Sequence, residues 1–140
     1  MALVWSQELS VGNAMIDSEH KNLIVMVNSL RDMIGAKDCS ALPQAFEQLE
    51  YCLSAHFANE AKLAQAINFP FSYNALAHQH LQNALQLIKD AVAVKSGIWA
   101  ADAAEHYSEF LSDWLTSHVI NEDMLMKPAL LAYPYEFNPG

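Results

Sequence analysis

Residues 41–67 read ALPQAFEQLEYCLSAHFANEAKLAQAI, and this stretch decides the fold. Its large apolar side chains recur at steps of three, four or six residues, as expected for one face of a helix: Phe46, Leu49, Leu53, Phe57, Leu63 and Ile67. Pro43 suits the first turn, because a proline there removes only a backbone N–H that has no helical partner. Asn68-Phe69-Pro70 ends the pattern. The stretch therefore predicts one long helix with a single buried face.

Similar spacing occurs on both sides of this stretch. A helix is expected to begin after Asp17 or Ser18, either of which is a good N-cap, and to stop at Gly35. The other predicted helices cover residues 18–35, 72–95 and 99–121. Short turns join them, which favours an all-α, up-down-up-down four-helix bundle.

The two ends of the chain lack a sustained period. Residues 1–17 are predicted to form an extended arm that packs Trp5 against the body, and residues 122–140, with three prolines, to form short or irregular structure. Neither linkers nor repeats interrupt the 140 residues, so one domain is expected over residues 1–140.

Composition limits the possible partners. The net charge of −9 leaves no basic patch for nucleic acid or for an anionic membrane surface. No apolar run approaches the ~20 residues that span a bilayer, and the N-terminal residues do not resemble a signal peptide. We therefore expect a cytoplasmic protein. Cys39 and Cys52 have neither zinc-ligand nor redox-motif spacing.

Titratable side chains interrupt the apolar face of every predicted helix. They are His20, His56 with Glu60 one turn later, His78, and His118 followed by Asp123. A lone inward histidine is more often a hydrogen-bonded core residue than a metal ligand. Several such groups buried together would each cost about 1–3 kcal/mol if unpaired, and a metal centre would satisfy them all.

The donor types narrow the choice of metal. Imidazole nitrogen suits iron, copper, nickel and zinc, whereas carboxylate oxygens can bridge two hard cations. Because no thiolate is in register, structural zinc is disfavoured. Nitrogen-rich ligation with two carboxylates inside a helical bundle favours a pair of irons.

The same residues resemble the motifs of bacterial hemerythrins. The likeness begins with Trp5 and Leu9-Ser10-Val11-Gly12, followed by Ile16-Asp17 and His20-Lys21. It continues through His56-Phe57 with Glu60, and ends with Trp114-Leu115, His118 and Asp123. It covers nearly the whole chain in the expected order.

The resemblance implies a four-helix bundle, two non-haem irons and dioxygen as the bound molecule. It assigns His20 and His56 to one iron and His118 to the other, with Glu60 and Asp123 bridging the pair. It also implies that Trp114 and Leu115 line the oxygen pocket and keep water out.

The third predicted helix departs from the family pattern, which has two histidines four residues apart. His78 and His80 lie about 200° apart around a helix, so both cannot comfortably be ligands. If His78 is the ligand, its partner one turn earlier is Asn74, a possible weak ligand; if His80 is the ligand, that partner is Leu76. The apolar face favours His78. His106 lies three turns before His118 and is not expected among the ligands.

Three functions remain open at this point. The preferred hypothesis is a dioxygen-binding protein, for carriage, storage or sensing, rather than an enzyme. An alternative is a di-iron peroxidase or oxidase that uses an open position on the iron of the third helix. Another is a sensor module of a signalling protein, or a degenerate site in a plain bundle.

Overall fold

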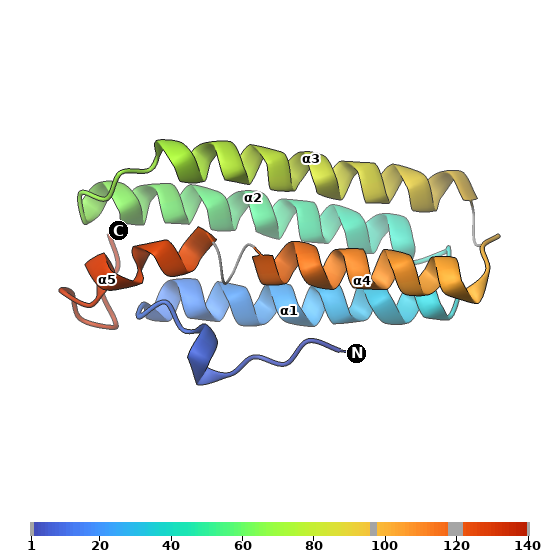
Figure 1. Cartoon of the computed structure of the whole chain (residues 1–140), viewed down its shortest axis with the longest axis horizontal. Coiled ribbons are helices and arrows are strands. Elements are labelled where there is room, and N and C mark those ends of the chain that lie inside the picture. Colours follow the sequence, from blue (N-terminus) through green and yellow to red (C-terminus); the bar gives the residue numbers. More distant parts are fainter. Residues whose placement is uncertain (1, 96–97, 118–121, 140) are drawn as a thin grey trace.

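A computed structural model describes residues 2–95, 98–117 and 122–139, with only the backbone of residues 72–74 and 101. Four long helices run alternately up and down along one axis (Figure 1). Their bounds are Ala14–Gly35 for α1, Leu42–Ala66 for α2, Ser72–Lys95 for α3 and Ala101–Ser117 for α4. The α1 helix contacts α2 and α4, and α3 contacts the same two helices. These contacts close a ring, and the predicted four-helix bundle is confirmed.

The first helix begins four residues before the expected start at residue 18. Asn13 is extended and is the N-cap, since its side-chain oxygen accepts a hydrogen bond from the Ile16 N–H at 3.1 Å. Asp17, predicted as a possible cap, lies one turn inside the helix and is buried. Its carboxylate instead accepts hydrogen bonds from Val11 in the arm and Tyr135 in the tail. Because the helix begins at Ala14, the prediction of an arm reaching residue 17 was wrong.

The other long helices lie close to their predicted ranges. The α3 bounds match, and α2 is one residue shorter at each end than predicted. The α4 helix begins at Ala101 rather than residue 99, because Trp99 is buried before the helix starts and donates from Nε1 to the Ile34 carbonyl at 3.3 Å. Its predicted end, residues 118–121, lies outside the described residues.

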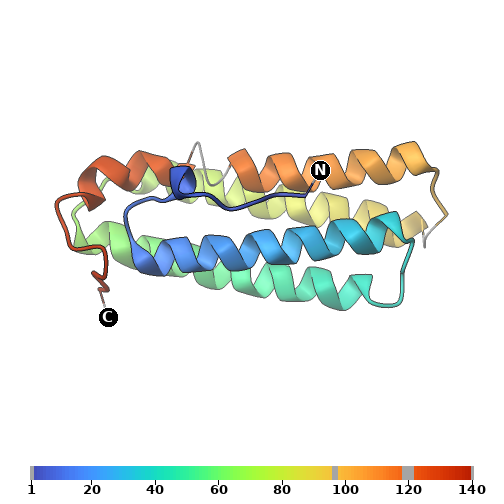
Figure 2. The same ribbon diagram turned by 90° about the horizontal axis from the view of Figure 1, so that it is seen from below.

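Both chain ends lie against the bundle. The arm runs beside α1 and α4 (Figure 2), and the Asn28 side chain makes two hydrogen bonds to the Leu3 backbone at 2.8 and 2.9 Å. A 3-10 helix, η1 (Gln7–Leu9), follows. After α4, the 3-10 helix η3 (Asp123–Met126) leads into the single turn α5 (Lys127–Leu130).

Two apolar clusters fill the interior. The larger one takes residues from α1 to α4, among them Leu23, Leu53, Leu85 and Leu115. The smaller one closes one end of the bundle with Val11, Ile16, Leu63, Ala64, Ile67, Met126 and Leu130. Among the described helices, none is long and apolar enough to cross a membrane.

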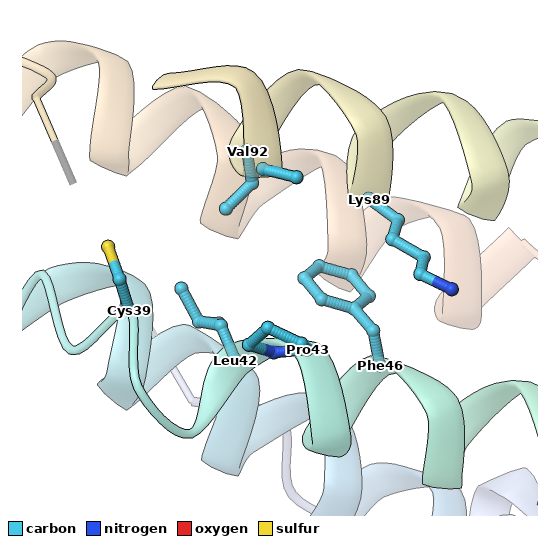
Figure 3. Close-up of a pocket in the computed structure, with 7 residues that line it drawn as sticks. Cys39, Leu42, Pro43, Phe46, Lys89 and Val92 are labelled. Carbon is cyan, nitrogen blue, oxygen red and sulfur yellow. The ribbon is translucent and has the colours of Figure 1, made fainter. Parts of the chain in front are cut away.

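A cavity of about 210 Å³ lies where the start of α2 faces the last turns of α3 (Figure 3). Leu42, Phe46 and Val92 line it together with Cys39 and Lys89. Lys89 is already paired with Glu50, at 2.7 Å. The cavity is mainly apolar and shares no residue with the cluster of buried histidines and carboxylates described next.

Candidate metal centre

A layer of polar side chains separates the two apolar clusters. On α1, buried His20 lies four residues after Ile16 of the smaller cluster and three before Leu23 of the larger. On α2, Glu60 likewise lies three residues before Leu63. The same helical period that forms the core therefore points these polar groups inward.

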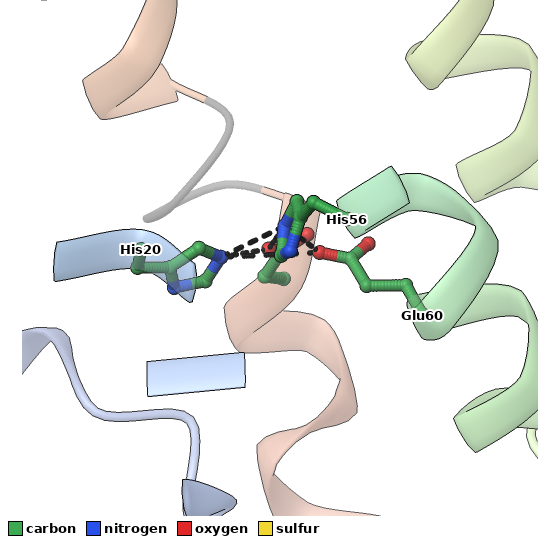
Figure 4. Close-up of side chains that lie close together, drawn as sticks. His20, His56 and Glu60 are labelled. Carbon is green, nitrogen blue, oxygen red and sulfur yellow. Dashed lines mark hydrogen bonds and ion pairs between the residues drawn. The ribbon is translucent and has the colours of Figure 1, made fainter. Parts of the chain in front are cut away.

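Four side chains meet in this layer. His20, His56, Glu60 and Asp123 each offer a ligand atom, and these atoms lie within 4.8 Å of one another. The Nε2 atoms of His20 and His56 are 3.2 Å apart, and Figure 4 shows the two imidazoles converging with Glu60. His20 Nε2 contacts Asp123 Oδ2, and His56 Nε2 contacts Glu60 Oε1. The four residues come from α1, α2 and η3, so the tertiary fold assembles the cluster.

Glu60 connects this cluster to a third helix. Its Oε1 atom faces His56 and lies 3.8 Å from His20 Nε2, whereas its Oε2 atom lies 2.9 Å from His78 Nε2 on α3. One buried carboxylate thus has histidines from three helices around its two oxygens. A carboxylate placed in this way can serve two cations.

His78 rather than His80 lies in the core. His78 is 5% exposed, and its ring stacks on Phe57 at 3.7 Å with an interplanar angle of 6°. Phe71 meets the same ring edge-on at 5.4 Å. His80 and His106 are exposed. The burial agrees with the register that the apolar face favoured.

Carboxylates surround His56 in this layer. Burial by itself lowers the pKa of His56, but the Glu60 carboxylate and hydrogen bonds to Asp123 and Glu19 hold that pKa well above its ordinary value of 6.5. Two nitrogens that are each about 2.1 Å from one metal lie roughly 3.0–3.4 Å apart, and the two Nε2 atoms are separated by 3.2 Å. The donor set therefore fits a nitrogen- and oxygen-ligated metal such as iron.

The predicted oxygen-pocket residues lie in the larger apolar cluster. Trp114 and Leu115 are both buried on α4, and Trp114 Nε1 donates to the Leu81 carbonyl at 2.8 Å. Predicted ligand His118 lies outside the described residues, and so does the side chain of Asn74, although the Asn74 backbone belongs to α3.

The sequence pattern did not identify two residues beside the cluster, Glu19 and Asn59. Glu19 Oε1 accepts a hydrogen bond from His56 Nδ1 at 2.7 Å, and Glu19 Oε2 accepts one from Asn59 Nδ2 at 2.5 Å. Glu19 is one residue away from His20 and therefore about 100° off its inward face. Apolar periodicity does not identify such a position; a carboxylate beside a ligand histidine is the only signal available.

Comparison with known proteins places these features in a family. Residues 11–130 match the hemerythrin HHE cation binding domain. The chain is 32% identical to a bacteriohemerythrin of Pseudomonas aeruginosa, over 86% of this chain and 76% of the relative. A bacteriohemerythrin of Stenotrophomonas maltophilia is 25% identical over 96% and 86% of the two chains, and a hemerythrin-like protein of Naegleria gruberi is 28% identical over 90% and 92%. No solved structure gives a significant match.

Proposed function

The chain belongs to the hemerythrin family, and we propose that it binds dioxygen at a pair of non-haem irons in the middle of the bundle. Oxygen carriage, storage or sensing would each begin with this binding step. The proposal is supported by the family and by buried imidazoles and carboxylates that converge without a competing thiolate among the described residues of the cluster.

The position of Glu60 is the main observation in favour of two metals. Its two oxygens face different histidines, His56 on one side and His78 on the other. A metal held by His56 would face one of these oxygens, and a metal held by His78 would face the other. We therefore assign Glu60 as a bridge between two irons.

The other donors divide between the two irons. We assign His20 and His56 to one iron, and His78 and His118 to the other, with Asp123 as the second bridge. Asp123 supports this role because its Oδ2 atom contacts His20 and lies 3.3 Å from His56 Nε2. We also propose that the Asn74 amide is a weak ligand, because Asn74 precedes His78 by one helical turn.

Apolar residues of the bundle give this layer its dry surroundings. Iron(II), when bound, supplies the electrons that the binding of dioxygen requires. Phe57 covers one face of the His78 ring, and Trp114 and Leu115 are buried on α4. The Trp114 N–H is already bonded to a backbone carbonyl, so this side chain presents an oriented apolar ring rather than a proton donor. We propose that these walls keep water away from the centre.

Iron content and colour test the proposal. Metal-free protein is loaded anaerobically with Fe(II), desalted, and analysed for iron per chain before air is admitted. We expect two irons per chain and a near-ultraviolet and visible charge-transfer band that fades when oxygen is removed. His20→Ala should lose about half of the iron, together with the colour that needs both irons, and exposed His80→Ala should retain both. A wild-type protein that stays colourless and iron-free would contradict the proposal.

A binding protein is distinguished from an enzyme by turnover. We propose binding, because family members are oxygen-binding proteins. The peroxidase alternative depends on Asn74 leaving a coordination position open. It predicts that the iron-loaded wild type oxidises a dye with hydrogen peroxide faster than Asn74→His. Equal or slower turnover by the wild type would support binding as the function.

A further inference from the structure

The outer nitrogen of His56 has its own carboxylate. His56 Nε2 points into the metal layer, whereas Nδ1 points the opposite way, to Glu19 Oε1 at 2.7 Å. Glu19 belongs to α1 and His56 to α2, so the contact joins two helices. The Glu19 side chain is 24% exposed, whereas that of His56 is 1% exposed. Glu19 therefore stands between the buried layer and solvent.

A second contact fixes Glu19 itself. Asn59 Nδ2 donates to Glu19 Oε2 at 2.5 Å, which leaves Oε1 directed at His56. Asn59 lies three residues after His56 on α2, so both residues project from neighbouring positions of one helix face. Both oxygens of Glu19 are thus engaged, and the carboxylate has little freedom to turn away.

This geometry determines which nitrogen of His56 keeps its proton when a metal binds. A carboxylate only accepts hydrogen bonds, so Nδ1 keeps its N–H toward Glu19, and a metal that displaces the proton at Nε2 meets a lone pair there. The lone pair is the form that a metal needs. The negative charge beside Nδ1–H also increases the electron density that Nε2 donates. Glu19 cannot ligate the same metal as Nε2, because it lies on the far side of the ring.

We propose that Glu19 is a positioning residue for the His56 ligand, held in place by Asn59, and that it strengthens metal binding at this half of the centre. The inference rests on the proposed function, because it takes His56 as a ligand. This role of Glu19 differs from that of a simple surface ion pair, which would stabilise the fold with no effect on the affinity of the folded protein for metal.

Zn(II), which is diamagnetic and has no redox chemistry, is the probe. Its dissociation constant is measured by competition with a chelator for the wild type and for Glu19→Gln, which keeps the shape but removes the charge. We expect the dissociation constant to rise about tenfold or more. The Nδ1–H proton resonance of His56 in the zinc-loaded protein should move upfield, because its hydrogen bond weakens. Glu105→Gln, at an exposed glutamate on α4, is the matched control and should change neither value.

A second variant keeps the test decisive if Glu19→Gln does not fold. Asn59→Ala leaves the carboxylate but releases its Oε2 atom, and we expect a smaller rise, about threefold, with the same direction of the Nδ1–H shift. Zinc affinity within twofold of wild type in the folded variant, with the His56 resonance unmoved, would overturn the inference alone. Failure of the wild type to bind either Fe(II) or Zn(II) would instead overturn the proposed function.

Discussion

His20 and His56 direct their Nε2 atoms to within 3.2 Å of each other from different helices, with ring planes 65° apart. At this angle the two rings are not stacked, and each ring offers a nitrogen lone pair or an N–H toward the other. If both nitrogens carried protons, the two N–H groups would oppose each other. A cation between the lone pairs removes this conflict and also neutralises Glu60 and Asp123, which approach the same two nitrogens.

Metal loading should therefore stabilise the bundle. Only the folded chain brings these donors together, so bound metal adds to the free energy of unfolding, by about 2.7 kcal/mol when free metal is a hundred times its dissociation constant. Thermal unfolding followed by circular dichroism, with Fe(II) under anaerobic conditions and after chelation, measures this shift. His20→Ala should reduce the shift, because one of the two irons loses a donor, and His80→Ala should preserve it. Identical melting temperatures with and without metal would contradict the prediction.

The two histidines of α3 should behave differently. His78 is buried and contacts Glu60 Oε2 at 2.9 Å, whereas His80 is exposed. We expect His78→Ala to lose about half of the iron per chain, since the iron held by His20 and His56 keeps its donors, and His80→Ala to lose none. Iron analysis after desalting checks both. Equal iron content in the two variants would mean that His78 is a core residue only.

The periodicity of the sequence predicted most of the fold and much of the candidate centre. Helical spacing depends on local sequence, so the inward faces containing His20, His56 and His78 could be identified without coordinates. The apolar face that continues through Leu81 and Leu85 favoured His78 over His80.

Features that depend on distant segments escaped prediction. Asn13 and Asp17 are both good N-caps, but Asp17 is occupied by other hydrogen bonds, one of them from Tyr135 at the other end of the chain. Glu19 escaped for a related reason: its partner His56 lies on another helix. Local patterns contain no information about either contact.

Proton competition should make metal binding depend on pH. Burial lowers the pKa of His56, but the Glu60 carboxylate, aided by Asp123 and Glu19, outweighs this effect and raises the pKa well above 6.5, so a proton competes with metal for this imidazole. A metal must displace that proton. Below the raised pKa, we expect affinity for Zn(II) to increase about tenfold per pH unit for one proton released.

The stability of the metal-free fold should have the opposite pH dependence. Because the folded-state pKa of His56 is raised, its ion pairs stabilise the fold fully below the unfolded-state value of about 6.5, and this stabilisation is lost as pH rises through the folded-state pKa. Zinc calorimetry in two buffers of different ionisation enthalpy counts the protons released, and urea unfolding at several pH values measures the metal-free stability. A pH-independent zinc affinity below neutrality would be inconsistent with this account.

Asp17 should be a large contributor to stability outside the centre. Its buried carboxylate accepts hydrogen bonds from Ser10 Oγ at 2.5 Å, the Val11 N–H at 3.0 Å and Tyr135 Oη at 2.8 Å. These contacts tie the arm and the tail to the start of α1, and the same tail segment carries Asp123. Asp17→Ala would leave buried donors unpaired, so we expect a loss of about 2–4 kcal/mol in the free energy of unfolding.

Tyr135→Phe separates the tail contact from the rest. It removes one hydrogen bond from Asp17 and leaves the other two, so the expected loss is about 1 kcal/mol. Urea unfolding of the metal-free variants measures both losses. Because Tyr135 and Asp123 share the tail, Tyr135→Phe should also weaken zinc binding slightly, whereas exposed Tyr51→Phe should change neither quantity. If Asp17→Ala unfolds at the wild-type urea concentration, the buried carboxylate does not anchor the two chain ends.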